Sequence, residues 1–107
     1  MNDFEFDSAV AVLKAKDSYD FADLCLVVEA LRHPRGCPWD REQTHKSIRK
    51  NMLEEAYEAA EAIDIEDSAL LCEELGDVML QTVLHASISN ANGGFDIGDV
   101  CTGICKK

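Results

Sequence analysis

The sequence predicts an all-α protein, a four-helix-bundle-like fold that assembles as a dimer. Apolar residues recur every three or four positions along most of the chain, which is the period of an amphipathic helix. No segment alternates apolar and polar residues strongly enough to indicate a half-buried strand. Both prolines lie within residues 33–40, and this segment separates two helical patterns. Helices joined by short loops are the architecture that these features favour.

The first 19 residues mix acidic and apolar side chains without a clear core pattern, although residues 9–16 favour a short helix. We therefore expect residues 1–19 to be a poorly defined leader or linker from a longer protein, and residues 20–107 to form the helical domain. The first helix of that domain should begin at Asp20 and end before Pro34. Its apolar positions are Phe21, Leu24, Val27, Val28 and Leu31.

Residues 33–40 are expected to form a loop because they contain two prolines and a glycine. Asp40 then begins a helix, and Gln43, three residues later, completes a capping-box pattern. A long helix should follow over residues 47–63, with a break over residues 64–67.

The next helix is predicted over residues 68–89, with Ser68 or Asp67 as its N-cap. Its sequence is apolar around most of the circumference, which is typical of a buried helix. Residues 92–94, Asn-Gly-Gly, mark a turn, and Asp96 caps a last helix. The chain ends within that helix, which is therefore expected to be truncated.

The composition limits the partners that this chain can bind. A chain of 107 residues is one small domain that buries only part of its surface, so we expect a homodimer or a higher homo-oligomer. A formal net charge of −11 argues against nucleic-acid polymers and anionic membranes, and a phosphate ligand would need a metal ion as a bridge. No apolar run has the length of a membrane span, and the acidic N-terminus lacks the basic start of a signal peptide. We expect a cytoplasmic protein.

The five cysteines form no C-x-x-C motif, and most lie at apolar helical positions, where buried free thiols are the usual state. Cys101 and Cys105 lie one helical turn apart but have no third or fourth ligand nearby in the sequence. Because a structural zinc site requires four ligands, we do not expect zinc there.

Five carboxylates at helical spacing are the strongest candidates for a functional site. Glu54, Glu55 and Glu58 lie in the helix predicted over residues 47–63, and Glu74 and Asp77 lie in the next one. Residues three or four apart share a helix face, so each helix presents a pair of carboxylates in one direction. Two pairs that face each other would form a site for a divalent cation.

The second pair supports the metal hypothesis more strongly than the first. Glu74, Asp77 and Gln81 form one narrow polar stripe on the otherwise apolar helix, and no Lys or Arg lies between Lys50 and Lys106. Close carboxylates without basic partners repel each other unless a cation holds them ionised, and Mg²⁺ prefers such oxygen ligands. For the first helix, taken alone, a solvated acidic face is the simpler interpretation.

Several motifs together resemble a known family. They are the segment Gly36-Cys37-Pro38-Trp39-Asp40-Arg41-Glu42-Gln43-Thr44-His45, then Leu53-Glu54-Glu55-Ala56-Tyr57-Glu58, then Glu73-Glu74-Leu75-Gly76-Asp77, and His85-Ala86. From about residue 20 to its end, the chain resembles the MazG family of all-α nucleoside triphosphate pyrophosphohydrolases.

The resemblance implies Mg²⁺-dependent hydrolysis of a nucleoside triphosphate, with Mn²⁺ as a possible substitute, to the monophosphate and pyrophosphate. It assigns the metal to Glu55, Glu58, Glu74 and Asp77, which match the family's metal-binding carboxylates. Glu54 matches the remaining motif position, where we expect it to orient water or another ligand. Which of these catalytic carboxylates acts as general base is left open.

Three further residues are candidates for substrate binding. Trp39 either stacks on a nucleobase or, as we favour, staples the start of the next helix. Gln81 lies one turn beyond Asp77, within reach of a metal-bound water or the substrate. Lys107 aligns with the start of a basic segment that in the family is associated with the phosphate tail.

Other polar residues have two interpretations each. His45 and His85 are either acid–base residues or, more commonly for a lone histidine in a helical domain, structural. The cations near the start of the long helix either supply positive charge to phosphates or solubilise a helix face; these are Arg41, Lys46, Arg49 and Lys50.

A non-enzymatic alternative also fits the acidic helices. The chain can be an acidic helical oligomerisation or regulatory module of a larger fusion protein, in which case the carboxylates would bind no catalytic metal.

Overall fold

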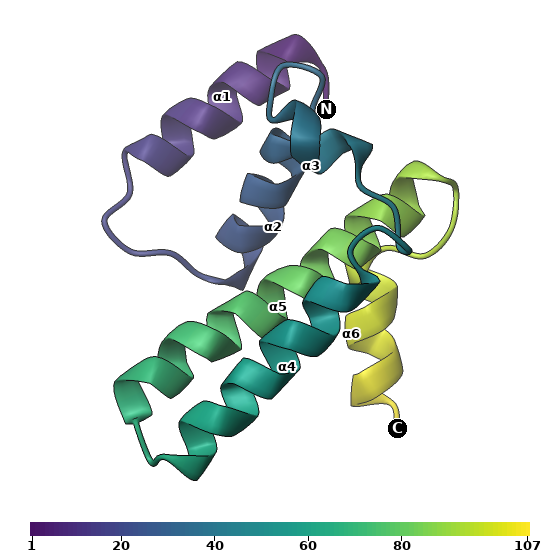
Figure 1. The fold of residues 1–107 in the computed structure, drawn as a ribbon. Helices are drawn as coiled ribbons and strands as arrows, with labels where there is room; N and C mark the ends of the chain where they lie inside the picture. Colours follow the sequence, from purple (N-terminus) through teal and green to yellow (C-terminus); the bar gives the residue numbers. More distant parts are fainter. The chain divides into compact units, whose positions relative to one another are not determined.

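The computed structural model describes residues 1–107 and contains helices, turns and no strand (Figure 1), which confirms the predicted all-α class. The helices are α1 (Asp3–Lys14), α2 (Phe21–Leu31), α3 (Pro38–Glu42), α4 (Arg49–Asp64), α5 (Ser68–Ala91) and α6 (Ile97–Cys105). They form two compact units, Met1–Gln43 and Thr44–Lys107, which we describe separately. None of the helices is both long enough and apolar enough to cross a membrane.

In the first unit, α1 packs against α2. The helix α1 begins at Asp3, earlier than the short helix expected over residues 9–16, because Asn2 and Glu5 form a capping box. The side chain of Asn2 accepts a hydrogen bond from the Glu5 backbone N–H at 2.7 Å, and Glu5 accepts one from the Asn2 backbone at 3.1 Å. Residues expected to be a poorly defined leader therefore contain a capped helix.

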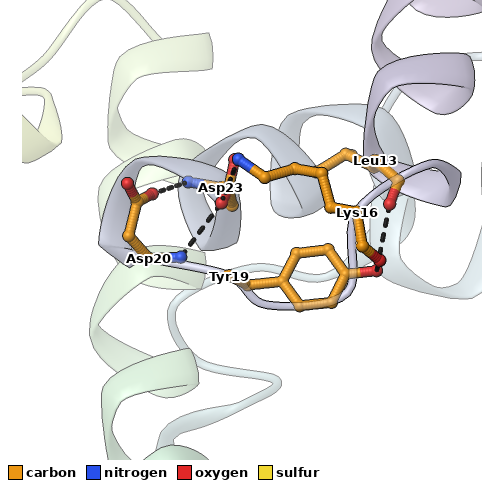
Figure 2. Close-up of polar contacts among 5 residues, drawn as sticks. All are labelled: Leu13, Lys16, Tyr19, Asp20 and Asp23. Carbon is orange, nitrogen blue, oxygen red and sulfur yellow. Dashed lines mark hydrogen bonds and ion pairs between the residues drawn. The ribbon is translucent and has the colours of Figure 1, made fainter.

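Polar contacts fix the connection between α1 and α2 (Figure 2). Lys16 Nζ lies 2.8 Å from the Asp23 carboxylate, and this contact raises the pKa of Lys16 and lowers the pKa of Asp23. The hydroxyl of Tyr19 donates to the carbonyl of Leu13 at 3.0 Å. Asp20 is the N-cap of α2 and forms a capping box with Asp23. The helix predicted to begin at Asp20 is therefore confirmed.

The start of α3 differs from its prediction. The helix begins at Pro38, and Asp40 lies inside its first turn rather than at the N-cap. Proline is favoured at the first position of a helix because its missing N–H is not needed there. Gln43 does not complete a capping box; its side-chain amide donates to the carbonyl of Trp39 at 2.9 Å. The expected loop over residues 33–40 therefore ends at Cys37.

Gly36 lies in this loop where no side chain fits. A Cβ at this position would lie 2.1 Å from the carbonyl oxygen of Ala30 and 2.5 Å from that of Leu31. Both atoms belong to the backbone at the end of α2, so they cannot move aside as a flexible side chain would. The close return of the loop to α2 requires glycine.

In the second unit, α4 and α5 form an antiparallel helical hairpin and α6 packs against α5 (Figure 1). The helices expected over residues 47–63 and 68–89 are confirmed, with ends that differ by one or two residues. Asp67 is the N-cap of α5 and accepts a hydrogen bond from the Leu70 backbone at 3.0 Å. Asp96 caps α6 in a capping box with Asp99, as predicted from its position.

Helices α4 and α5 end in the same kind of hydrogen-bonded turn. After α4, the N–H of Asp67 donates to Ala62 at 3.1 Å, and after α5 the N–H of Gly94 donates to Ser89 at 2.8 Å. This Schellman motif places one residue in the left-handed region, Gly93 with φ 78° after α5 and Glu66 with φ 56° after α4. Glycine adopts that conformation without steric cost, whereas glutamate does not.

Burial along α5 is uneven. Its second half is buried, including Gln81, Val83, Leu84, Ala86 and Ile88, whereas Leu75 and Met79 in the first half are exposed. The expectation that the whole helix is buried therefore holds for its second half. The buried apolar residues of the unit are Ile48, Ala59, Ala62, Val83, Leu84, Ala86 and Ile88.

The five cysteines form no disulfide, as expected, but the prediction that they are buried is wrong. Cys25 and Cys37 are half-buried, and Cys72, Cys101 and Cys105 are exposed. Apolar spacing shows which residues share a helix face, but it does not show which face a neighbouring helix covers. Helix α6 contacts α5 and leaves much of its own surface open, so Cys101 and Cys105 are exposed.

Candidate metal site on helices α4 and α5

Four of the predicted carboxylates meet between α4 and α5. Each of Glu55 and Glu58 from α4, and Glu74 and Asp77 from α5, offers an oxygen, and these four oxygens lie within 4.8 Å of one another. The spacing of three residues in both helices places each pair on one face, and the hairpin turns the two faces together. We call these four residues the carboxylate cluster.

The carboxylate cluster has no basic partner. No Lys or Arg side chain forms an ion pair with any of its members. Oε2 of Glu55 and Oε2 of Glu74 are buried and accept no hydrogen bond. A buried carboxylate oxygen without a donor is unfavourable, and a positive ligand at the cluster would satisfy both oxygens.

Burial and the neighbouring carboxylates raise the pKa values of Glu74 and Glu55. Burial, the hydrogen bond to Glu58 and the charges of Glu58 and Asp77 raise the pKa of Glu74 to about 7. Burial is also the largest cause of the raised pKa of Glu55, followed by the charges of Glu58 and Asp77. Without a cation the cluster therefore retains a proton near neutral pH, and a bound cation would displace it.

The donor set fits a hard divalent cation. All four ligands are carboxylate oxygens, which Mg²⁺ and Mn²⁺ prefer, whereas the softer metals favour nitrogen and sulfur. The two orphaned oxygens, on Glu55 and Glu74, provide acceptors that such an ion would satisfy.

Glu54 lies outside the carboxylate cluster, although its sequence position is adjacent to Glu55. Its side chain is exposed and lies 3.6 Å from Lys50 Nζ, one turn earlier on α4. Because neighbouring helical residues point about 100° apart, Glu54 and Glu55 cannot both face α5. An indirect role for Glu54, such as orienting water, stays a prediction.

Gln81 extends the polar stripe of α5 one turn beyond Asp77, as the sequence indicated. Its side chain is 6% exposed, and its Oε1 accepts no hydrogen bond. A buried amide oxygen without a donor is costly, so Gln81 resembles Glu55 and Glu74 in lacking a partner.

The other two substrate-binding candidates are Trp39 and Lys107, and neither is a member of the carboxylate cluster. Trp39 is within α3 of the first unit and is 59% exposed, so it does not staple a helix start at Asp40 as we favoured. Lys107 is exposed after α6, and its backbone N–H donates to Ile104. Substrate contacts by Trp39 and Lys107 stay predictions.

Sequence reasoning did not predict that two histidines form a pair. Nδ1 of His45 and Nδ1 of His85 lie 2.8 Å apart, within hydrogen-bond distance. His85 falls on the same stripe of α5 as Glu74 and Gln81, at spacings of eleven and four residues, so its direction on the helix could be predicted from the sequence. His45 lies in the turn before α4, where no periodicity indicates its direction.

Known proteins share the part of the sequence that contains the carboxylate cluster. Residues 43–107 match the model of the MazG nucleotide pyrophosphohydrolase domain. The chain is 47% identical over 87 residues to the nucleoside triphosphate pyrophosphohydrolase/pyrophosphatase MazG of Thermotoga maritima, covering 81% of this chain and 34% of that protein. It is 44% identical over 85 residues to the nucleoside triphosphate pyrophosphohydrolase of Escherichia coli K12, covering 78% of this chain and 32% of that protein.

A third relative is the uncharacterized protein YabN of Bacillus subtilis, which is 49% identical over 89 residues. That similarity covers 83% of this chain and 18% of YabN. The chain thus spans about a fifth to a third of the length of these relatives. The matched domain includes the complete carboxylate cluster and both paired histidines, and the chain belongs to the MazG family.

Proposed function

We propose that this chain is a divalent-metal-dependent nucleoside triphosphate pyrophosphohydrolase. It would hydrolyse a ribo- or deoxyribonucleoside triphosphate between the α- and β-phosphates, giving the monophosphate and pyrophosphate. The observation that carries the proposal is the carboxylate cluster, four converging carboxylates without a basic partner. The names of the relatives from Thermotoga maritima and Escherichia coli support the same reaction.

Glu55, Glu58, Glu74 and Asp77 would hold Mg²⁺, or Mn²⁺ in its place. When bound, the ion would neutralise charge on the phosphate oxygens and make a water molecule more acidic. The net charge of −11 would otherwise repel a triphosphate, so substrate binding would depend on the cation.

The neighbouring residues would position the reactants. Glu54, exposed beside the cluster, would accept a hydrogen bond from the attacking water and orient it. Gln81 has an unpaired Oε1 that would accept a hydrogen bond from water or from the substrate. Trp39 would contact the base, and Lys107 would contact the phosphate tail.

A homodimer would cover the apolar residues that this hairpin leaves exposed. Leu53 and Tyr57 lie one turn apart on α4, with 46% and 76% of their surface exposed, and Leu75 and Met79 lie one turn apart on α5. Two apolar stripes on adjoining helices are a suitable surface for a second copy.

Because nucleoside triphosphates are cytoplasmic metabolites, we also propose that the protein is cytoplasmic.

The test is the release of pyrophosphate from a panel of nucleoside triphosphates with Mg²⁺. Glu58→Gln and Asp77→Asn remove a charged ligand with little change in shape and should lower kcat at least a hundredfold. Glu61→Gln is the matched control, because Glu61 is an exposed carboxylate of α4 outside the cluster. Circular dichroism would establish that all three variants fold.

The alternative function, a non-catalytic oligomerisation or regulatory module, gives a different result. In that case the wild-type chain binds no divalent cation and releases no pyrophosphate, and Glu58→Gln stabilises the fold by removing repulsion. Wild-type activity that is retained in both cluster variants would also overturn the proposed site.

A further inference from the structure

A second candidate site lies on the same helical hairpin, towards the start of α4. It is a cavity of about 330 Å³, lined by His45, Lys46, Arg49, Met52, Leu53 and His85. Cavities of this size that combine apolar walls with a few polar groups are typical small-molecule sites. Met52 and Leu53 supply the apolar walls, and the histidine pair supplies a polar edge. We call this cavity the histidine pocket.

The geometry of the two imidazoles limits what they can do. Their planes differ by 4°, their centroids are 5.0 Å apart, and their Nδ1 atoms are 2.8 Å apart. These values place the rings edge to edge in nearly one plane, with one Nδ1–H donating to the other Nδ1. The ring that donates then has an acceptor at Nε2, and the other ring has a donor at Nε2.

The histidine pair itself presents a neutral edge to a ligand, with one donor and one acceptor. Burial, followed by the charge of His45, lowers the pKa of His85, so its imidazole remains neutral at physiological pH. Protonating both rings would bring two N–H groups together and break the hydrogen bond between them. The charged groups facing the pocket are Lys46 and Arg49, and they disfavour a second positive charge there.

The histidine pocket and the carboxylate cluster lie on one line along the hairpin. On α5, His85, Gln81 and Asp77 follow one another at intervals of one turn, and on α4 Met52 lies one turn before Glu55. The rise from Asp77 to His85 is about 12 Å, which an extended nucleotide can span. Gln81, with its unpaired Oε1, lies between the two sites.

We propose that the histidine pocket binds the nucleobase of the substrate whose phosphates lie at the carboxylate cluster. This inference rests on the proposed function. A base is planar and aromatic, so its faces suit Met52 and Leu53, while its ring nitrogens and exocyclic groups suit the donor and acceptor of His45 and His85. The sugar then passes Gln81. The pocket therefore contributes to substrate affinity, and it does not take part in the cleavage of the phosphoanhydride bond.

Direct binding is measured first, without metal and without turnover. The proton NMR signals of the imidazole rings are followed while adenosine, and separately cytidine, is added to the metal-free protein. The rings of His45 and His85 should shift in a saturable manner, whereas His33, in the first unit, is an internal control that should not shift. A pocket that binds no base gives no shift at His45 and His85, or equal small shifts at all three histidines.

A kinetic test separates the base from the phosphates. Met52→Trp fills the pocket, and Ile63→Trp places the same bulk at an exposed position of α4 outside it. Met52→Trp should raise the KM for ATP about tenfold or more, the effect of losing one base contact, and leave kcat for inorganic tripolyphosphate within about twofold. Ile63→Trp should alter neither.

The outcomes for the two proposals are distinguishable. If Met52→Trp affects ATP and tripolyphosphate equally, or neither, the pocket does not bind the base and the proposed hydrolysis is unaffected. If the wild-type chain hydrolyses no triphosphate, the proposed function fails, and the histidine signals alone then decide whether the pocket binds nucleosides.

Discussion

Replacing Glu74 by Gln should change how the stability of the metal-free protein depends on pH. The pKa of Glu74 is raised to about 7 in the folded protein, from 4.5 in the unfolded chain, chiefly by burial and by its contact with Glu58. Between these two pH values the folded state holds a proton that the unfolded state has released. Stability contributed in this way is fully present below pH 4.5 and is lost as pH rises towards 7.

The size of the effect follows from the same two values. In the middle of the window the folded form binds nearly one more proton than the unfolded form through Glu74 alone, and Glu55 acts in the same direction. Glu74→Gln removes the first contribution, so its free energy of unfolding should fall less steeply between pH 4.5 and 7. Above pH 7 without metal, the variant should be the more stable protein, because one buried charge is absent.

Urea denaturation followed by circular dichroism from pH 4.5 to 8.5 measures this difference. The metal-free wild type, Glu74→Gln and the exposed control Glu61→Gln are compared, and the slopes give the difference in bound protons. Glu61→Gln should follow the wild type. Addition of Mg²⁺ at pH 8 should stabilise the wild type and reverse the order with Glu74→Gln. Equal slopes for the wild type and Glu74→Gln would refute the description of the cluster as a group of partly buried, mutually repelling carboxylates.

Three further predictions concern the fold. Gly36→Ala should destabilise the protein by about 1–3 kcal/mol, because the new Cβ would overlap the carbonyl oxygen of Ala30. Gly103→Ala should instead stabilise α6 by about 0.5–1 kcal/mol, because the space around Gly103 is open and alanine favours the helix. Glu66→Gly should stabilise by about 0.5–1 kcal/mol by relieving the left-handed conformation that Gly93 occupies after α5; an unchanged stability would contradict this. Asp67→Ala should lose about 0.5–2 kcal/mol with the cap of α5, while Asp64→Ala should change little. Urea denaturation measures all of them.

The parts of the fold that were predictable from the sequence depend on residues that are close together in the sequence. Asp20, Asp67 and Asp96 each precede an apolar helical pattern, and each caps its helix through the backbone three residues later. The carboxylate cluster was predictable for a related reason. Spacings of three residues give the direction of the side chains on each helix, and a short turn between two helices forces them to lie antiparallel.

The features that could not be predicted depend on contacts between distant residues or on competing local signals. His45 and His85 are 40 residues apart and share no sequence pattern, so their hydrogen bond appears only in the folded hairpin. Near α3, Asp40 resembled an N-cap, but Pro38 already fixes the helical backbone two residues earlier. The exposure of Cys101 was not predictable because apolar spacing does not indicate which faces a neighbouring helix covers.

We propose that Glu55, Glu58, Glu74 and Asp77 together bind one divalent cation. Electron paramagnetic resonance of free Mn²⁺, followed during titration of the protein at pH 8, measures this binding. We predict one Mn²⁺ bound per chain in the wild type and in Glu61→Gln, displaced by excess Mg²⁺ and lost in folded Asp77→Asn. Undiminished binding in Asp77→Asn and Glu58→Gln, or no binding in the wild type, would contradict the claim.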